Sequence, residues 1–246
     1  MARSREHLTR APVREALVDI QFEPAVDIAR IKLFVDSVAA EFDRVTPMIE
    51  AEFGMEADRA RASQRSLGWR LDSDSRHYVL ICRLGGFTLS RLSPYGTWGE
   101  LRAEAERWWG RFAEATRPET VNRVAVRYIN AIGIPLPMAD FRDFLTCPPE
   151  IPPEMPQGLA SFLSRMVIPF ADQDCACIVT QALEAAQPAP DSPPSASVLL
   201  DIDVFRIVRY PALPWDGIAR TLDTLREVKN LTFFSHITER TVEMFE

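Results

Sequence analysis

The chain has 246 residues, a formal net charge of −7, 47% hydrophobic residues and 26% charged residues. This composition is typical of a folded globular protein and excludes a disordered chain, which cannot bury enough apolar surface to fold. A protein that binds nucleic acid irrespective of sequence needs a surplus of positive charge, so the negative balance argues against that class.

The first seven residues include Arg3, Arg5 and Glu6, and they lead into no apolar stretch of the signal-peptide type. No run reaches the roughly 20 apolar residues that a membrane-spanning helix needs. We therefore expect a cytoplasmic protein that makes no membrane contact. Its four cysteines are then free thiols, because that compartment is reducing.

The first half of the chain begins with a strand pattern over residues 13–22, where apolar and polar side chains alternate from Val18 to Phe22. Asp27 then fits a helix N-cap, because apolar residues follow it at spacings of three and four. Residues 44–62 give no clear pattern. Alternation predicts strands at 67–72, 77–84 and 87–92, and Thr97 with Glu100 predicts a capping box that opens a second helix.

The second half begins with the strongest strand pattern of the chain, at residues 121–134. Prolines interrupt the next segment, where short helices are expected around residues 141–145 and 159–166. Strands are expected at 175–183 and 198–208, with a loop rich in proline and serine at 187–197 between them. A last long helix is expected to begin at Asp216.

This order of elements, β-α-β-β-β-α followed by a similar β-(short α)-β-β-α, predicts an α+β protein with an antiparallel sheet packed by long helices. No linker separates the two parts at residues 117–120. We therefore expect a single compact domain built of two similar-looking halves, at about residues 11–118 and 119–246.

Five short stretches carry a family resemblance: Ala11–Ala16, Ser93–Tyr95 with Trp98, Arg123–Asn130, Leu200–Asp203, and Phe234 with Ile237–Glu239. In these stretches the chain resembles a sporadically distributed family of uncharacterised bacterial proteins of about this length. The match spans nearly the whole chain. It implies no established activity, cofactor or catalytic residue, and the patchy distribution of the family suggests a defence-associated or toxin-linked role.

Charged residues on two predicted strands are the first candidates for a site. Arg123 and Arg127 are four residues apart and share a strand face, about 13 Å from each other. Asp201 and Asp203 share a face of another strand in the same way. With Asn130, the arginines could bind an anion, and the two aspartates could hold a divalent metal through oxygen ligands. The alternative is that these groups form salt bridges across strands.

Aromatic residues are the second set of candidates. Tyr95 and Trp98 lie at a strand-to-helix corner, where they could stack on a ligand or plug the start of the helix. Trp108 and Trp109 are adjacent on a helix, so we expect one in the core and the other half-exposed. Trp98 and Trp109 are therefore candidate interface residues, and Tyr95 is a candidate ligand contact.

The sequence contains no nucleophile elbow, phosphate loop or zinc-binding helix motif. Cys175 and Cys177 share a strand face, but the chain lacks the paired spacing of a zinc site, and its three histidines are scattered. We therefore expect no cofactor and assign no catalytic residue. A non-enzymatic role is favoured.

Three functions remain open. The favoured one is an interaction or accessory factor that binds another protein or a copy of itself. The second is a binder of a small anionic ligand, a nucleotide or polyphosphate, which would use the arginine-lined sheet face with Asn130 and Tyr95. The third is a divalent-metal-dependent phosphoryl-transfer or hydrolytic enzyme built on Asp201 and Asp203.

Overall fold

The computed structural model describes residues 8–56, 59–184 and 195–246, without the side chains of residues 51–63. The predicted loop at 187–197 thus lies mostly outside the described residues. The strands are β1 (Val13–Glu23), β2 (Arg44–Glu56), β3 (Arg59–Ser73), β4 (Tyr78–Arg83), β5 (Gly86–Leu92), β6 (Thr120–Pro135), β7 (Leu163–Phe170), β8 (Cys175–Glu184) and β9 (Ser195–Pro211). The α-helices are α1 (Ile28–Val38), α2 (Trp98–Thr116), α3 (Asp216–His236) and α4 (Glu239–Glu243).

These strands form one antiparallel sheet in the order β2-β3-β4-β5-β1-β6-β9-β8-β7. The predicted α+β class with an antiparallel sheet is therefore confirmed. The strand order is mirrored about its centre: β1 is followed outward by β5, β4 and β3, and β6 is followed outward by β9, β8 and β7. In each half the first strand lies beside the last one, and a long helix follows that last strand.

The chain divides into two compact units. Unit 1 contains the segment up to Ala16, Ala125–Arg206 and Leu222–Glu246, and unit 2 contains Leu17–Val124 and Ile207–Thr221. The division passes within β1, β6, β9 and α3, so neither unit is one continuous piece of chain. Its boundaries also differ from those of the halves expected from the order of elements.

The helices of unit 2 begin where the sequence predicts. The Asp27 carboxylate accepts a hydrogen bond from a backbone N–H in the first turn of α1, at 2.8 Å. At the start of α2, the Glu100 N–H donates to Thr97 Oγ1 at 3.2 Å, and the Thr97 N–H donates to Glu100 Oε2 at 2.8 Å. Because these caps are local, they are readable from the sequence alone.

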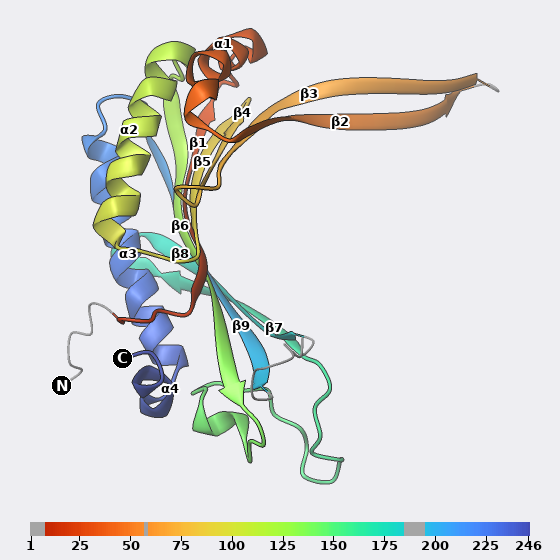
Figure 1. The fold of residues 1–246 in the computed structure, drawn as a ribbon, viewed down its shortest axis with the longest axis vertical. Helices are drawn as coiled ribbons and strands as arrows, with labels where there is room; N and C mark the ends of the chain where they lie inside the picture. Colours follow the sequence, from red (N-terminus) through yellow and green to blue (C-terminus); the bar gives the residue numbers. More distant parts are fainter. Residues whose placement is uncertain (1–7, 57–58, 185–194) are drawn as a thin grey trace. The chain divides into compact units, whose positions relative to one another are not determined.

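An aromatic cluster forms the core of unit 2, on the side of the sheet where α2 lies (Figure 1). The Trp109 ring centroid is 5.5 Å from that of Phe87 on β5 and 6.0 Å from that of Phe22 on β1. Phe112 lies 5.5 Å from both Phe87 and Phe34, which joins α1 to the cluster. Helix α2 is thus held by the sheet and by α1.

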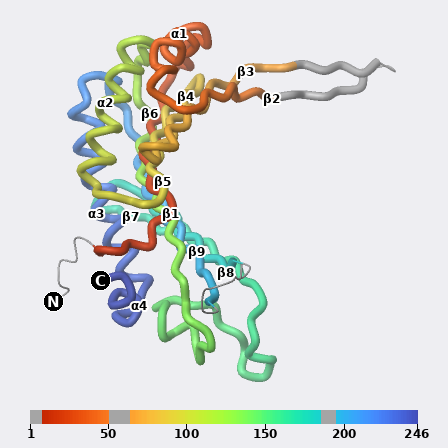
Figure 2. The backbone as a smooth tube through the Cα atoms, in the orientation of Figure 1, coloured from red at the N-terminus to blue at the C-terminus, as the bar shows by residue number. Residues whose placement is uncertain are grey.

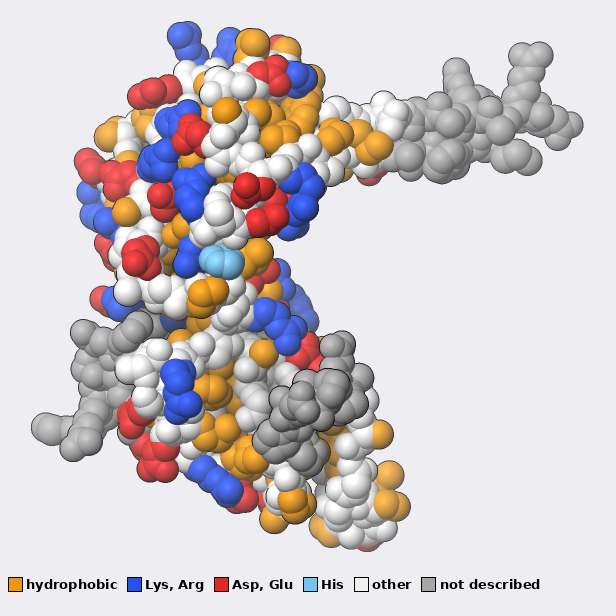
Figure 3. Space-filling model, viewed as in Figure 1, with side chains coloured by type: hydrophobic (Ala, Val, Ile, Leu, Met, Phe, Trp, Pro, Cys, Tyr) orange, Lys and Arg blue, Asp and Glu red, His pale blue; other side chains and the backbone are white. Residues whose placement is uncertain are grey.

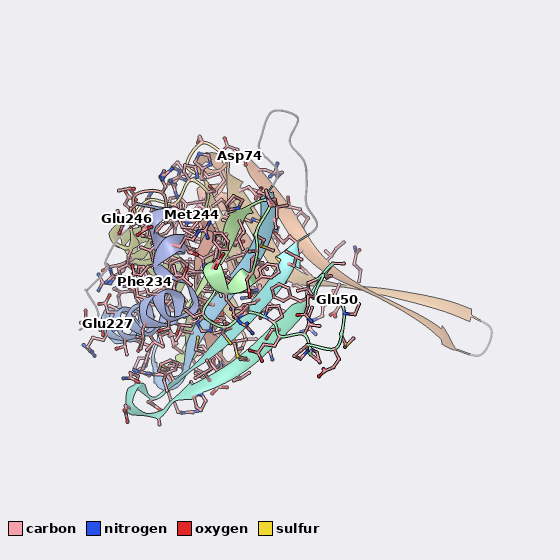
Figure 4. All side chains as sticks on the ribbon, turned by 90° about the horizontal axis from the view of Figure 1, so that it is seen from below. Glu50, Asp74, Glu227, Phe234, Met244 and Glu246 are labelled. Carbon is pink, nitrogen blue, oxygen red and sulfur yellow. The ribbon has the colours of Figure 1, made fainter. Side chains whose placement is uncertain are left out.

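Of residues 44–62, which gave no clear pattern, residues 44–56 and 59–62 belong to the ribbon β2–β3. The two strands pair from Arg44 with Asp72 to Glu56 with Arg59. Strand β4 pairs only with residues 68–73 of β3, so the rest of the ribbon is two-stranded (Figures 1 and 2). Figure 4 labels Glu50 on it. The first half therefore has one strand more than predicted. None of the side chains of residues 44–50 is buried, so no buried face imposes apolar alternation there.

In unit 1, the covered face of β6, β9 and β8 packs against the C-terminal part of α3, on which Figure 4 labels Glu227 and Phe234. The Cys177 thiol of β8 lies 3.7 Å from the Thr232 hydroxyl of α3. The fully buried side chains of this core include Val126, Ile132, Leu200, Ile202, Val204 and Leu225. Even-numbered residues of β6 and β9 thus face the helix, as the alternation predicts.

The prediction of a short helix around residues 159–166 is wrong. Residues 163–170 form strand β7, which pairs antiparallel with β8. Leu159, Phe162, Leu163 and Met166 have helical spacing, but pairing with β8 overrides this local pattern. The second half therefore also has one strand more than predicted, and only the 3₁₀ turn Phe141–Asp143 remains of the short helices.

None of the described helices is both long and apolar enough to cross a membrane. The longest of them, α3, has 21 residues. Charged residues occur along its length, from Asp216 to Lys229.

Candidate functional site

On the face of the unit 1 sheet that lies opposite α3, Arg127 and Asp201 form a two-point ion pair. Arg127 Nε and Nη2 donate to the two carboxylate oxygens at 2.8 and 2.5 Å. This bond raises the pKa of Arg127 above its usual value, and the charges of Asp201, Asp203 and Glu15 add to the effect. Arg127 is therefore matched by a carboxylate, as in the salt-bridge alternative.

Asp19 on β1 is the centre of a second charged cluster, which lies in unit 2. Its buried carboxylate accepts hydrogen bonds from Thr88 at 2.6 Å and from Arg83 at 2.7 Å. Arg123 Nη1 and Gln21 Nε2 each donate to the other oxygen at 3.2 Å. Arg123 is thus one of two arginines that share a buried carboxylate, which is the pairing that stabilises a buried charge.

Asn130 lies on the helix-facing side of β6 and does not join the arginines. It is buried, as are Tyr128 and Ile132 on either side of it in the alternation. Its Nδ2 donates to the Leu200 carbonyl on β9 at 2.9 Å. The expectation that Asn130 contributes to the charged face is corrected, because an even offset from Tyr128 places it on the core face.

The expectation that one of the adjacent tryptophans is half-exposed is also wrong. Trp108 and Trp109 are both buried. Trp109 joins the aromatic cluster, and Trp108 packs against Phe42, with 5.0 Å between the ring centroids. Helix α2 therefore has neighbours on two sides, which removes Trp109 as an interface candidate. Tyr95 and Trp98 are partly exposed, at the corner between β5 and α2.

In the described part of the chain, no group of three or more His, Cys, Asp or Glu side chains could hold a metal ion. Asp201 already accepts hydrogen bonds from Arg127 with both oxygens. Burial raises the pKa of Cys177 to about 11, and it raises the pKa of Cys82 as well. Both thiols therefore stay protonated near neutral pH, which makes them poor nucleophiles.

A hollow of about 460 Å³ lies beside Arg123 in unit 2. Its lining is formed by Gln21, Glu23, Asn122, Arg123, Ile207, Val208 and Arg209. Both arginines in this lining have carboxylate partners: Arg123 pairs with Asp19, and Arg209 pairs with Glu23, each at 3.2 Å. An anion entering this hollow would compete with carboxylates for both cations, which weakens the case for an anion site there.

Strand β7 forms the edge of the sheet in unit 1 and exposes apolar side chains. Leu163 is 75% exposed and Val167 is 56% exposed, with exposed Arg165 between them. This feature could not be predicted from the helical spacing of residues 159–166, which favours a helix. The signal that could have found it is the alternation of these three residues, followed by the proline at position 169, which is a residue typical of edge strands.

The backbone of β7 also points half of its polar groups away from the sheet. The Phe162 carbonyl accepts a hydrogen bond from the Leu183 N–H, at 3.1 Å. In an antiparallel strand alternate residues bond to the same neighbour, so even-numbered residues of β7 bond to β8. The N–H and C=O groups of Leu163, Arg165 and Val167 therefore point outward, where none of the described strands follows in the sheet order.

Comparison with known proteins found no family model that matches the chain and no curated protein that matches it. The resemblance to a bacterial family stays an expectation drawn from the five sequence stretches.

Proposed function

We propose that this protein binds a partner protein that adds an extended segment to the edge strand β7. The observation that carries the proposal is the combination of outward backbone groups and exposed apolar side chains on Leu163 and Val167. Within the described part of the chain no strand pairs with this edge, and such an edge is a template for a further strand. Backbone hydrogen bonds would supply affinity, and alternate side chains would supply specificity.

The side chains on β7 define what the added segment should carry. Val167 lies opposite Ile178 on β8 and Leu163 lies opposite Ala182, whereas Arg165 between them lies opposite Thr180. Side chains of a strand added to β7 would lie opposite Leu163, Arg165 and Val167 and so continue these cross-strand pairs. We therefore expect a partner segment with an acidic residue that meets Arg165 and an apolar residue two positions away on each side.

A second copy of β7 fits this surface less well than a foreign acidic segment. Strand β7 has the sequence LSRMVIPF, which contains no acidic residue. A copy paired with itself therefore offers no carboxylate to Arg165. Pro169 has no N–H to donate, so the paired segment ends near Ile168. The charge on β7 thus favours a different protein as the partner.

A peptide-display experiment tests the proposal with the full chain as the immobilised bait. From a random peptide library, we expect enrichment of sequences with the order apolar, any, acidic, any, apolar. For the variant Arg165→Glu, the enriched central residue should change from Asp or Glu to Lys or Arg. Enrichment that is unrelated to this pattern, or that is unchanged by Arg165→Glu, overturns the proposal.

Two further variants test the backbone and the apolar contact. Val167→Pro removes one outward N–H and leaves the even-numbered residues bonded to β8, so it should abolish peptide binding with little loss of stability. Val167→Glu should weaken binding at least tenfold, whereas Leu231→Glu on α3, where Leu231 is 60% exposed, should not. A dimer in light scattering that Val167→Glu dissociates would instead make a second copy the occupant of this edge.

A further inference from the structure

A second hollow, of about 540 Å³, lies in unit 2 and is separate from β7. It is formed by the turn before β4, the end of β5 and the first turns of α2. Its lining consists of Arg76, Tyr78, Arg91, Glu100, Ala103, Glu104 and Arg107. This volume is within the range of small-molecule sites. Figure 3 shows positive and negative side chains interspersed over α2.

Two of its arginines are held in place by oxygens that carry no charge. Arg76 donates to Ser73 Oγ at 3.2 Å and to the Glu41 carbonyl at 2.9 Å. Arg91 donates to the carbonyls of Pro94 and Arg76. These bonds fix both guanidinium groups through uncharged oxygens, whereas Arg123 and Arg209 bond directly to carboxylates. The charge of Arg76 also acts on the nearby Glu41 carboxylate, whose pKa it helps to lower.

The same two arginines are also stacked on aromatic rings. The Arg91 guanidinium lies 4.9 Å from the ring centroid of Tyr78, and that of Arg76 lies 5.7 Å from the ring centroid of Phe42. Stacking leaves the in-plane N–H groups available as donors. Two positioned cations with donors to spare are suited to a carboxylate or a similar oxyanion.

Helix α2 supplies the negatively charged residues of the lining. Glu104 Oε1 accepts a hydrogen bond from Arg107 at 3.4 Å, but its Oε2 is buried and has no hydrogen-bond partner among the described residues. The carboxylate is therefore weakly satisfied within the protein, and the exposed part of the Glu104 side chain, 26% of it, can accept a hydrogen bond from a ligand ammonium group. Glu100 adds a second carboxylate to the lining.

We propose that this hollow binds a zwitterionic ligand of the free amino-acid class, with its carboxylate on Arg76 and Arg91 and its ammonium on Glu104. Such a ligand carries a negative and a positive charge within one small molecule, so it matches both the arginines and the glutamates of the lining. A phosphate dianion matches the arginines but is repelled by Glu100 and Glu104. The proposal concerns a small-molecule site and does not depend on partner binding at β7.

Calorimetric titration of the full chain with each of the common L-amino acids tests the ligand class. At least one is expected to bind, and its N-acetyl derivative and its amide should each bind at least tenfold more weakly, because each lacks one of the two charges. Inorganic phosphate should not compete. The proposal is overturned if no amino acid binds, or if the N-acetyl derivative or phosphate binds as well as the amino acid.

Two matched pairs of variants test the place of binding. Arg91 and Arg111 each stack on an aromatic ring, that of Tyr78 and that of Trp108, but only Arg91 lines the hollow. Arg91→Gln removes one of the two cations proposed to hold the ligand carboxylate and should weaken amino-acid binding about tenfold, whereas Arg111→Gln should leave it unchanged.

Among the glutamates, Glu104→Gln should also weaken amino-acid binding about tenfold. Its control is Glu106→Gln, at an exposed position on the same helix, which should leave binding unchanged. The loss in Glu104→Gln should disappear when the N-acetyl derivative is the ligand, because that ligand has no ammonium group. Equal effects within either matched pair overturn the assignment of the site.

Discussion

Arg127 on β6 and Asp201 on β9 hold each other through two hydrogen bonds, at 2.8 and 2.5 Å, on the sheet face opposite α3. The carboxylate is largely buried, whereas the arginine side chain is 42% exposed. Each group satisfies the other, so the pair works as a structural clamp between two strands. Arg127 and Asp201, which the sequence suggested as ligand-binding and metal-binding residues, therefore contribute to the stability of the sheet.

Replacing Arg127 should destabilise the protein, because the Asp201 carboxylate then stays buried without a partner. We expect Arg127→Met to lower the free energy of unfolding by about 1–3 kcal/mol, measured by urea denaturation. The control is Arg14→Met, which breaks the more exposed pair with Glu184 and should cost about 0–1 kcal/mol. Equal losses in the two variants would contradict the clamp.

Trp109 should be a core residue in solution as well. Its Nε1 donates to the Ala212 carbonyl at 3.0 Å, so Trp109→Phe removes a buried hydrogen bond and leaves a cavity. We expect a loss of about 2–3 kcal/mol in the free energy of unfolding. Trp98→Phe, at a partly exposed position, should cost about 1 kcal/mol or less. A larger loss for Trp98→Phe would contradict this placement.

Gly68 on β3 should not tolerate a side chain. Its φ of +146° is unfavourable for other residues, and an added Cβ would lie 1.9 Å from the Cys82 carbonyl oxygen on β4. Gly68→Ala should therefore cost about 3 kcal/mol or more in thermal or urea unfolding. Gly110→Ala in α2 is the control, since its Cβ would meet nothing within 4 Å. That variant should gain about 0.5–1 kcal/mol from helix propensity.

Lys229 on α3 should make stability depend on pH. The residue is partly exposed, but its ammonium lies 3.9 Å from the ring centroid of Tyr128, and burial, with a smaller effect from Arg226, lowers its pKa from 10.5 to about 7. The folded state thus loses this proton before the unfolded state does. The contribution of Lys229 to stability therefore rises with pH between these two values.

The variant Lys229→Met isolates this effect from other titrating groups. Relative to the variant, the wild-type free energy of unfolding should rise by about 2 kcal/mol between pH 7 and pH 9. The chain has one other lysine, Lys32, which is exposed on α1 and pairs with Asp36. Lys32→Met serves as the control for the loss of a lysine charge at the surface. A constant difference for Lys229→Met would show that its ammonium is solvated.

The helices and inner strands could be predicted because their signals are local. Asp27 and the Thr97–Glu100 pair cap their helices through neighbours within three residues. Strands β2 and β7 could not be predicted, since each lies at an edge of the sheet and none of their described side chains is buried. Their extended conformation depends on pairing with β3 and β8, which is a tertiary contact that no local pattern records.

The candidate site residues were likewise predictable in part: their strand faces follow from the sequence, and their partners do not. Period-two alternation placed Arg123, Arg127, Asp201 and Asp203 on the correct strand faces, because faces follow from residue spacing alone. The partner of each charge depends on which strands are neighbours and in what register, so the pairs with Asp19 and Asp201 were left open. The burial of Trp109 likewise depends on residues far away in the chain, such as Phe22 and Phe87.

The mirrored strand order bears on how such a chain could originate. A half-length chain with the outward order first strand, last strand, then the two strands before it would leave its first strand at an open edge. If two such chains paired through their first strands, they would form one continuous sheet. Fusion of their genes would then reproduce the strand order on either side of β1 and β6. On this view α1 and β2 are an insertion in one copy, and the sheet is a duplicated dimer in a single polypeptide.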